Sequence, residues 1–182
     1  TFAQAGYVVH GCDLPEKRND LEQELRGTGI NLLPGGVAVS RRSDLIIYSV
    51  EAEKIEEVVA RCGPSTKLDA IVGGQTSVKT LEIQAFEKYL PEDTHIVTCH
   101  SLHGPSLPTK GQGLVVINHR SSGEAFTRAM EVYAQLGSTI IPIADYQEHD
   151  AITADTQVVT HLCFESMGTA WKNAGFYPWD NA

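Results

Sequence analysis

Residues 94–105, THIVTCHSLHGP, contain the change from strand to turn around which the rest of the chain is arranged. The first half alternates and is rich in β-branched side chains, which predicts a buried strand. The polar second half ends in Gly104-Pro105, a turn signal. His100 and His103 therefore lie at or just beyond a strand end, which is where open α/β sheets bind ligands. Each histidine could exchange a proton with a ligand or simply hydrogen-bond the turn.

The composition limits the class of protein. Of the 182 residues, 42% are hydrophobic and 20% are charged, which is typical of a globular chain. The net charge of -9 argues against a nucleic-acid partner. No apolar run is long enough to span a bilayer, and no basic region followed by an apolar run marks a signal peptide. The four cysteines are scattered without a C-x-x-C pair, which argues against a zinc ribbon and favours the reducing cytoplasm.

The first residues predict part of a dinucleotide-binding unit. Residues 1–6 resemble a last helical turn closed by Gly6, residues 7–10 a strand, and Asp13 stands at its end. Helix end, strand and acidic residue form the second half of a βαβ unit, whose first strand and G-x-G-x-x-G loop would lie just upstream. We therefore expect the chain to be a fragment that starts inside the first helix.

Strands and helices alternate through most of the chain and then give way to helix alone. Apolar patterns predict strands at 45–50, 68–72, 94–100, 113–118 and 138–143, helices at 15–26, 52–62, 78–90 and 122–136, and irregular structure at 27–36. One long helical segment follows at 146–171. This order predicts a nucleotide-binding domain over residues 1–144 and the beginning of a helical domain over residues 145–182.

Several side chains at strand ends are candidates for cofactor contacts. An acid such as Asp13 usually binds the ribose 2′-OH of NAD, whereas a basic residue such as Lys17 or Arg18 accommodates the 2′-phosphate of NADP. Both are present, so the residues leave the cofactor open, and a solvated helix start explains either base equally well. The small residues around Gly74 allow a ligand to approach the backbone. Ser77 precedes a helix and is either its N-cap or a group directed into the crevice.

A set of longer motifs carries a resemblance to a known family. The runs are SDLIIYSVE (43–51), IVGGQTS (71–77), FEKYLP (86–91), HSLHGP (100–105), VINHR (116–120), EHD (148–150), ITADTQ (152–157) and YPW (177–179). In this order they resemble prephenate dehydrogenase, most of all its fungal members in tyrosine biosynthesis, over nearly the whole chain. The family usually has proline at the position of Ser101.

The resemblance implies an α/β fold: a Rossmann-like nucleotide-binding domain lacking its first strand, followed by the start of an all-helical dimerisation domain. It implies oxidative decarboxylation of prephenate to 4-hydroxyphenylpyruvate with NADP, or NAD as the alternative, in a cytoplasmic homodimer. Catalytic roles would fall to His100 and Ser77, substrate contacts to His149, Gln157 and His161, and cofactor contacts to Asp13, Lys17, Arg18, Ser49, Val50 and Gly74, with no metal. The missing phosphate loop and the missing arginine for the substrate's carboxylates lead us to expect an inactive fragment.

Two other hypotheses remain. A hydroxy-acid dehydrogenase of the same architecture would use a lysine where this chain has His149 and His161. A metal-binding module could use Cys99, His100 and His103, although no fourth ligand is evident.

Overall fold

The strands form two separate sheets in the computed structural model, which describes residues 1–177. In the small sheet, β1 (Val9–Gly11) pairs in parallel with β2 (Ile30–Leu32). The large sheet has the order β3-β4-β5-β6-β7. Its strands are β3 (Leu45–Tyr48), β4 (Ile71–Gly74), β5 (His95–Ser101), β6 (Gly113–Arg120) and β7 (Thr139–Pro142).

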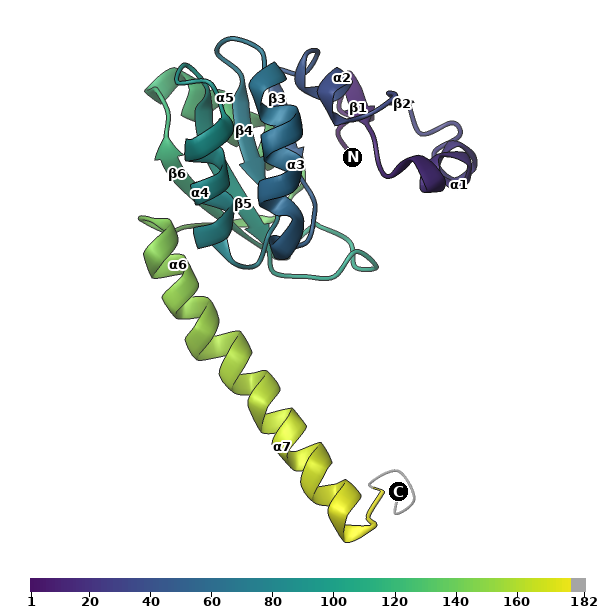
Figure 1. Cartoon of the computed structure of the whole chain (residues 1–182), viewed down its shortest axis with the longest axis vertical. Coiled ribbons are helices and arrows are strands. Elements are labelled where there is room, and N and C mark those ends of the chain that lie inside the picture. The colour runs from purple at the N-terminus through teal and green to yellow at the C-terminus, as the bar shows by residue number, and fades with distance from the viewer. Residues whose placement is uncertain (178–182) are drawn as a thin grey trace.

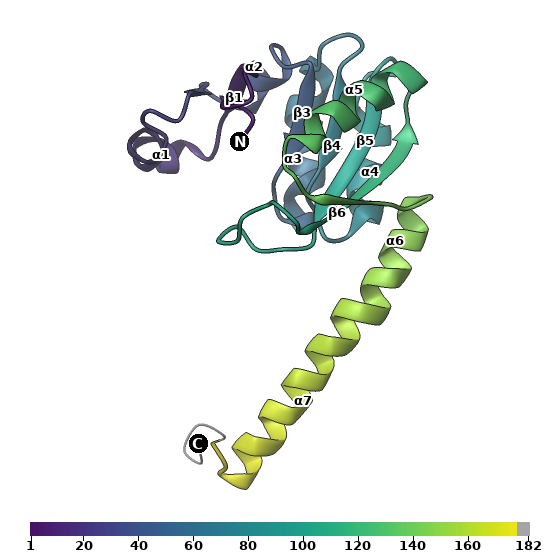
Figure 2. The same ribbon diagram turned by 180° about the vertical axis from the view of Figure 1, so that it is seen from behind.

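Helices cover both faces of the large sheet. The α-helices within residues 1–177 are α1 (Arg18–Glu24), α2 (Gly36–Ser40), α3 (Ile55–Cys62), α4 (Lys79–Tyr89), α5 (Gly123–Ala134), α6 (Tyr146–Thr153) and α7 (Val159–Ala174). Short 3₁₀ turns, Pro15–Lys17 and Ala52–Lys54, precede α1 and α3, and a third, Gly63–Ser65, follows α3. Helices α3 and α4 lie on one face of the sheet, and α5 lies on the other (Figures 1 and 2).

The two-sided burial of β5 explains its almost continuous apolar sequence. Ile96 packs into the core cluster beneath α3 and α4, whereas Val97 and Cys99 pack with Tyr133 in the cluster beneath α5. Successive strand residues point to opposite faces. The alternation therefore puts Thr98 and His100 on the same side as Ile96, facing α4.

Strand β6 runs antiparallel to β5. The connection, residues 102–112, contains no helix, and a parallel partner would need a longer crossover to bring the chain back to the start of β5. Strand β7 is parallel to β6, after the α5 crossover. The sheet is therefore mixed, and the predicted α/β fold class is confirmed.

The prediction of irregular structure at residues 27–36 is right for 27–29 and 33–35 and wrong for the residues between and after them. Strand β2 occupies its centre, and α2 begins at Gly36. Strand β2 has only three residues, and Gly27 and Gly29 with positive φ stand just before it. Turn residues so close to a short strand hide its pattern. The other predicted helices and strands are found, with strand β4 shifted toward Gly74, but residues 2–6 form turns in place of the predicted helix end.

The two sheets share no strand within residues 1–177. Strand β1 pairs only with β2, and β3 pairs only with β4, within residues 1–177. The small sheet and α1 lie beside the large sheet, next to the β3 edge (Figure 1).

Helix α6, a π-helical turn (Ala154–Val158) and α7 form one long rod that projects from the domain (Figures 1 and 2). The predicted long helical segment is present, with the π-helical turn inside it. No helix within residues 1–177 combines the length and apolar character needed to cross a membrane.

Candidate active site at the carboxyl ends of the strands

Three neighbouring parallel strands end at one edge of the large sheet. Ser49 and Val50 follow β3, Gly74 ends β4, and His100 is the next-to-last residue of β5. Ser49 is exposed and Val50 is half-buried, whereas Gly74 is buried and His100 is 7% exposed. This edge is the crevice where a dinucleotide and its substrate bind in related α/β folds.

His100 makes a direct contact with the start of the long rod. Its Nδ1 lies 3.0 Å from Nε2 of His149, which is 1% exposed on α6. Nδ1 of His149 in turn lies 2.8 Å from Oδ1 of Asp150. Two histidines and a carboxylate therefore form one line of polar contacts.

Asp150 also caps helix α4 from outside. Its carboxylate accepts hydrogen bonds from the backbone N–H groups of Lys79 and Thr80, both at 2.8 Å, and from the Thr80 hydroxyl at 2.7 Å. These groups form the helix N-terminus, where a negative charge is favourable. The N-cap position itself is Val78, which offers no side-chain hydrogen bond. The N-cap alternative for Ser77 is therefore wrong, and Ser77 is left as an exposed side chain just before the helix.

A buried ion pair lies beneath the same strand ends. Lys79 Nζ is 3.0 Å from Glu82 Oε1, and both side chains are fully buried. The ammonium also donates to the carbonyls of Gly74 at 3.0 Å and Cys99 at 2.6 Å. The Glu82 carboxylate accepts from the hydroxyls of Thr76 and Thr98. The pair thus joins β4, β5 and the first turn of α4.

Gly74 is required by this packing. A Cβ atom at Gly74 would stand 2.1 Å from a carboxylate oxygen of Glu82, so any side chain would displace the buried charge. This is a structural reason for glycine that is separate from the predicted approach of a cofactor.

The environment of His100 favours the neutral imidazole. Burial lowers the pKa of His100 to about 4, and nearby His149 and the Lys79 ammonium act in the same direction. Partial burial would raise the pKa of Asp150, but hydrogen bonds from Thr80, Lys79 and His149 hold that pKa below its usual value. At neutral pH the line of contacts therefore consists of a carboxylate and a neutral His100.

The side chains of the candidate cofactor residues after β1 differ in their exposure and in their hydrogen-bond partners. Asp13 is exposed and accepts from the backbone N–H of Leu14 at 2.7 Å. The Arg18 guanidinium is held by Glu22 at 2.9 Å and by the Leu33 carbonyl at 3.1 Å. Lys17 is exposed.

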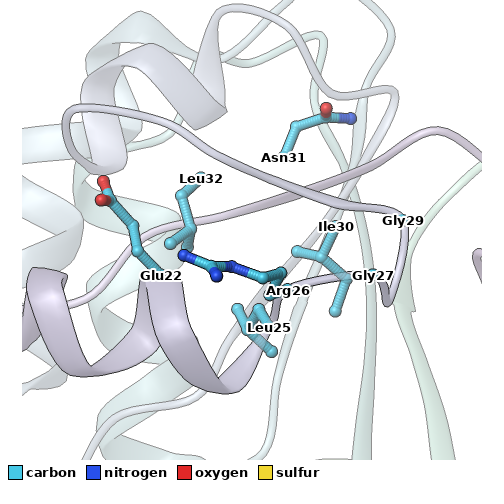
Figure 3. Close-up of a pocket in the computed structure, with 8 residues that line it drawn as sticks. All are labelled: Glu22, Leu25, Arg26, Gly27, Gly29, Ile30, Asn31 and Leu32. Atoms are coloured by element: carbon cyan, nitrogen blue, oxygen red, sulfur yellow. The ribbon is translucent and has the colours of Figure 1, made fainter.

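Two hollows flank this region. The larger, an open pocket of about 460 Å³ between α1 and β2, is lined by Glu22, Leu25, Arg26, Gly27, Gly29, Ile30, Asn31 and Leu32 (Figure 3). None of these is a predicted site residue. A narrow hollow of about 20 Å³ is lined in part by Asp13 and Arg18.

The three predicted substrate residues lie at different positions along the rod. His149 contacts His100, Gln157 lies half-buried in the π turn, and His161 is exposed on α7. His149 and His161 therefore lie at different depths.

Within residues 1–177, no three His, Cys, Asp or Glu side chains are grouped so as to hold a metal.

Lys79, Glu82 and Asp150 are not among the predicted site residues. Residues 79, 82, 83 and 86 share one face of α4, and the last two are the core residues Ile83 and Phe86. A lysine and a glutamate on an apolar helix face were therefore a signal of a buried pair. The Asp150 contact joins residues 71 positions apart and has no comparable local signal.

Comparison with known proteins gives close relatives in fungi. No protein-family model matches the chain. The chain is 49% identical over 179 residues to a probable prephenate dehydrogenase [NADP(+)] of Schizosaccharomyces pombe and 52% identical over 179 residues to the prephenate dehydrogenase [NADP(+)] of Saccharomyces cerevisiae. Each match covers 98% of this chain, but only 41% and 39% of the two relatives. The chain thus spans about two fifths of the length of the curated relatives it matches.

A solved structure shares the fold. Prephenate dehydrogenase of Aquifex aeolicus superimposes with a TM-score of 0.74 and 17% identity, covering 92% of this chain and 64% of that one. The same enzyme in complex with hydroxyphenyl propionate and NAD+ gives a TM-score of 0.73. The predicted resemblance to fungal prephenate dehydrogenase is confirmed.

Proposed function

We propose that the chain carries the cofactor-binding and catalytic part of an NADP-dependent prephenate dehydrogenase of tyrosine biosynthesis. The observation that supports this most is His100, a strand-end histidine whose surroundings favour the neutral imidazole. The chain is also about half identical to two fungal enzymes of that name. The reaction converts prephenate and NADP+ into 4-hydroxyphenylpyruvate, CO2 and NADPH. NAD is the alternative cofactor, as in the A. aeolicus complex.

The residues divide this work by their positions. His100 accepts the proton of the substrate's C4 hydroxyl, which is general-base work suited to an unprotonated imidazole. Ser77, which is exposed just before α4, orients the hydroxyl. Gln157 and His161 contact the substrate from the rod. The bound nicotinamide would supply the hydride acceptor.

The strand ends fit a dinucleotide. Ser49, Val50 and Gly74 present backbone at adjacent parallel strand ends, and Asp13 and Lys17 are exposed after β1. Arg18 is already engaged by Glu22 and Leu33, so Lys17 is the freer partner for the 2′-phosphate.

We also propose a division into a nucleotide-binding domain (1–144) and the beginning of a helical domain (145–182), of which residues 178–182 lie outside the described part. The Pro178-Trp179 portion of the family motif falls there too. A homodimer is supported by exposed apolar side chains on α7, such as Leu162 and Phe164. A cytoplasmic location is supported by four free cysteines.

The test of the base is His100→Asn in the full-length gene product. We expect kcat to fall by roughly 10²- to 10⁴-fold, the usual contribution of a positioned acid–base group, with prephenate binding nearly intact. Steady-state rates with prephenate and NADP are the measurement. A near-wild-type kcat would remove His100 from the mechanism.

The test of cofactor choice is Lys17→Ala. Loss of its charge should raise KM for NADP and leave KM for NAD unchanged, because only NADP carries the 2′-phosphate. Lys54→Ala, which removes an exposed lysine from the turn before α3, is the control. Equal effects on both cofactors would contradict the role of Lys17.

A further inference from the structure

The contacts among Asp150, His149 and His100 determine where their protons lie. A carboxylate only accepts hydrogen bonds, and the pKa of Asp150 is held below its usual value. The atom 2.8 Å from it, Nδ1 of His149, must therefore carry a proton. In a neutral imidazole the other nitrogen, Nε2 of His149, is then an acceptor.

The contact between the two histidines then determines the position of the His100 proton. Nε2 of His149 is 3.0 Å from Nδ1 of His100, and two acceptors cannot bond each other. Nδ1 of His100 must then be the donor. A neutral His100 consequently has no proton on Nε2, which is the nitrogen on the opposite side of the ring from His149.

We propose that His149 is a positioning residue for His100 rather than a ligand of the substrate. It holds His100 in the tautomer whose Nε2 accepts the substrate's proton, and Asp150 holds His149 in turn. This inference rests on the proposed function, in which His100 is the base. Burial supports it, because His149 is only 1% exposed and both of its ring nitrogens are already used.

The competing arrangement has the opposite hydrogen bond between the two rings. If His149 carried protons on both nitrogens, it would donate to Nδ1 of His100, and the His100 proton would move to Nε2. In the proposed arrangement the hydrogen bond between the rings runs the other way, and each ring donates toward α6.

Nitrogen-15 NMR of the imidazole rings in the wild-type chain is the direct test. We expect His100 and His149 each to show Nδ1 as the protonated nitrogen and Nε2 as the unprotonated one at neutral pH. An Nε2–H tautomer of His100 would overturn the proposal. This measurement needs no substitution, so it stands whether or not a variant folds.

Substitution of His149 separates positioning from substrate binding. In the full-length gene product, His149→Phe should lower kcat by roughly 10²-fold through misplacement of the base, with KM for prephenate changed by less than about twofold. His149→Gln, which retains an acceptor, should recover part of that loss. A raised KM with unchanged kcat in both variants would mean that His149 binds substrate and would overturn the proposal.

The matched control is His95→Gln. His95 lies on the same strand, and its Nε2 pairs with Asp69 at 2.8 Å, but it stands at the opposite end of β5. We expect unchanged His100 signals and unchanged kcat in this variant. If the control changes the His100 tautomer as much as His149→Phe does, the proposal that His149 holds this tautomer is rejected.

The two kinds of measurement distinguish failure of the proposed function from failure of the positioning role. Absence of prephenate turnover in the full-length wild type would remove the proposed function, and the NMR tautomers would still report on the hydrogen bonds. Turnover with an Nε2–H tautomer of His100 would remove the positioning role alone.

Discussion

At the scale of single residues, the charge state of His100 is set by what surrounds it. Burial is the main cause of its pKa of about 4, and the groups facing it are His149 and Asp150 on α6 and Lys79 on α4. The folded chain therefore binds a proton at His100 less readily than the unfolded chain does. Proton NMR titration should place the His100 midpoint near pH 4; a midpoint at or above 6.5 would contradict this account.

The same shift makes stability depend on pH. Between the unfolded pKa of about 6.5 and the folded value of about 4, only the unfolded chain is protonated at this site. The contribution of His100 to the free energy of unfolding is therefore complete above pH 6.5 and is lost as the pH falls to 4. The loss is at most about 3 kcal/mol. Urea unfolding at a series of pH values measures it, and His100→Asn should flatten the slope in that window.

The buried pair Lys79 and Glu82 affects the free energy of unfolding mainly when one partner is removed without the other. Removal of one partner leaves the other charge buried without a partner, which destabilises by about 3–5 kcal/mol, whereas removal of both can be nearly neutral. We expect Lys79→Met to lower the free energy of unfolding strongly and the double variant with Glu82→Leu to regain much of the loss. Chemical denaturation of the four proteins in a double-mutant cycle is the measurement.

An exposed pair provides the comparison. Lys88 and Glu56 lie 2.9 Å apart, but both side chains are more than half exposed. Lys88→Met should leave the denaturation midpoint unchanged, because solvent screens such pairs. Equal losses from Lys79→Met and Lys88→Met would show that burial is not what makes the first pair costly to break.

At the scale of elements, helix α4 depends on a carboxylate from α6. Asp150→Ala should cost about 1–2 kcal/mol of stability, the upper range for loss of a helix cap. It should also abolish hydrogen-exchange protection at the Lys79 and Thr80 amides, which donate to Asp150. Ser122→Ala, which removes the cap of α5, is the control. It should cost a similar amount without affecting exchange in α4.

The elements also show what sequence patterns can and cannot predict. The β-branched and apolar residues along β5 predicted a strand that ends near His100, because this composition is a local property of the sequence. The three-residue β2 was missed, since so short a run between glycines has no period to detect. The antiparallel direction of β6 follows from the length and character of a loop, which the strand patterns alone do not encode.

The candidate site was predictable in part for the same reason. His100 and Ser77 stand next to turn signals, so their positions at strand ends could be inferred. The contact of His100 with His149 joins residues 49 positions apart and depends on how α6 crosses α4. Such a contact is a product of tertiary packing, and no window of sequence contains it.

At the scale of the whole molecule, the projecting α7 carries apolar side chains into solvent. Leu162 is 56% exposed and Phe164 is 63% exposed. Contiguous exposed apolar surface favours association. We therefore expect the chain to self-associate and Phe164→Glu to reduce its weight-average mass in sedimentation equilibrium. Thr169→Glu, an exposed polar position on α7, is the control; equal effects of the two substitutions would point to charge rather than apolar contact.

The contact of Asp150 with the start of α4 acts as a pivot for this rod. Some 36 Å of helix extends beyond the pivot to Ala174, at about 1.5 Å per residue, whereas His149 lies only about 1.5 Å from it along the axis. A tilt of about 10° would sweep the far tip through roughly 6 Å and displace His149 by only about 0.3 Å. A tilt about this contact would therefore move the tip by several ångströms while the ring of His149 stays in hydrogen-bonding range of His100.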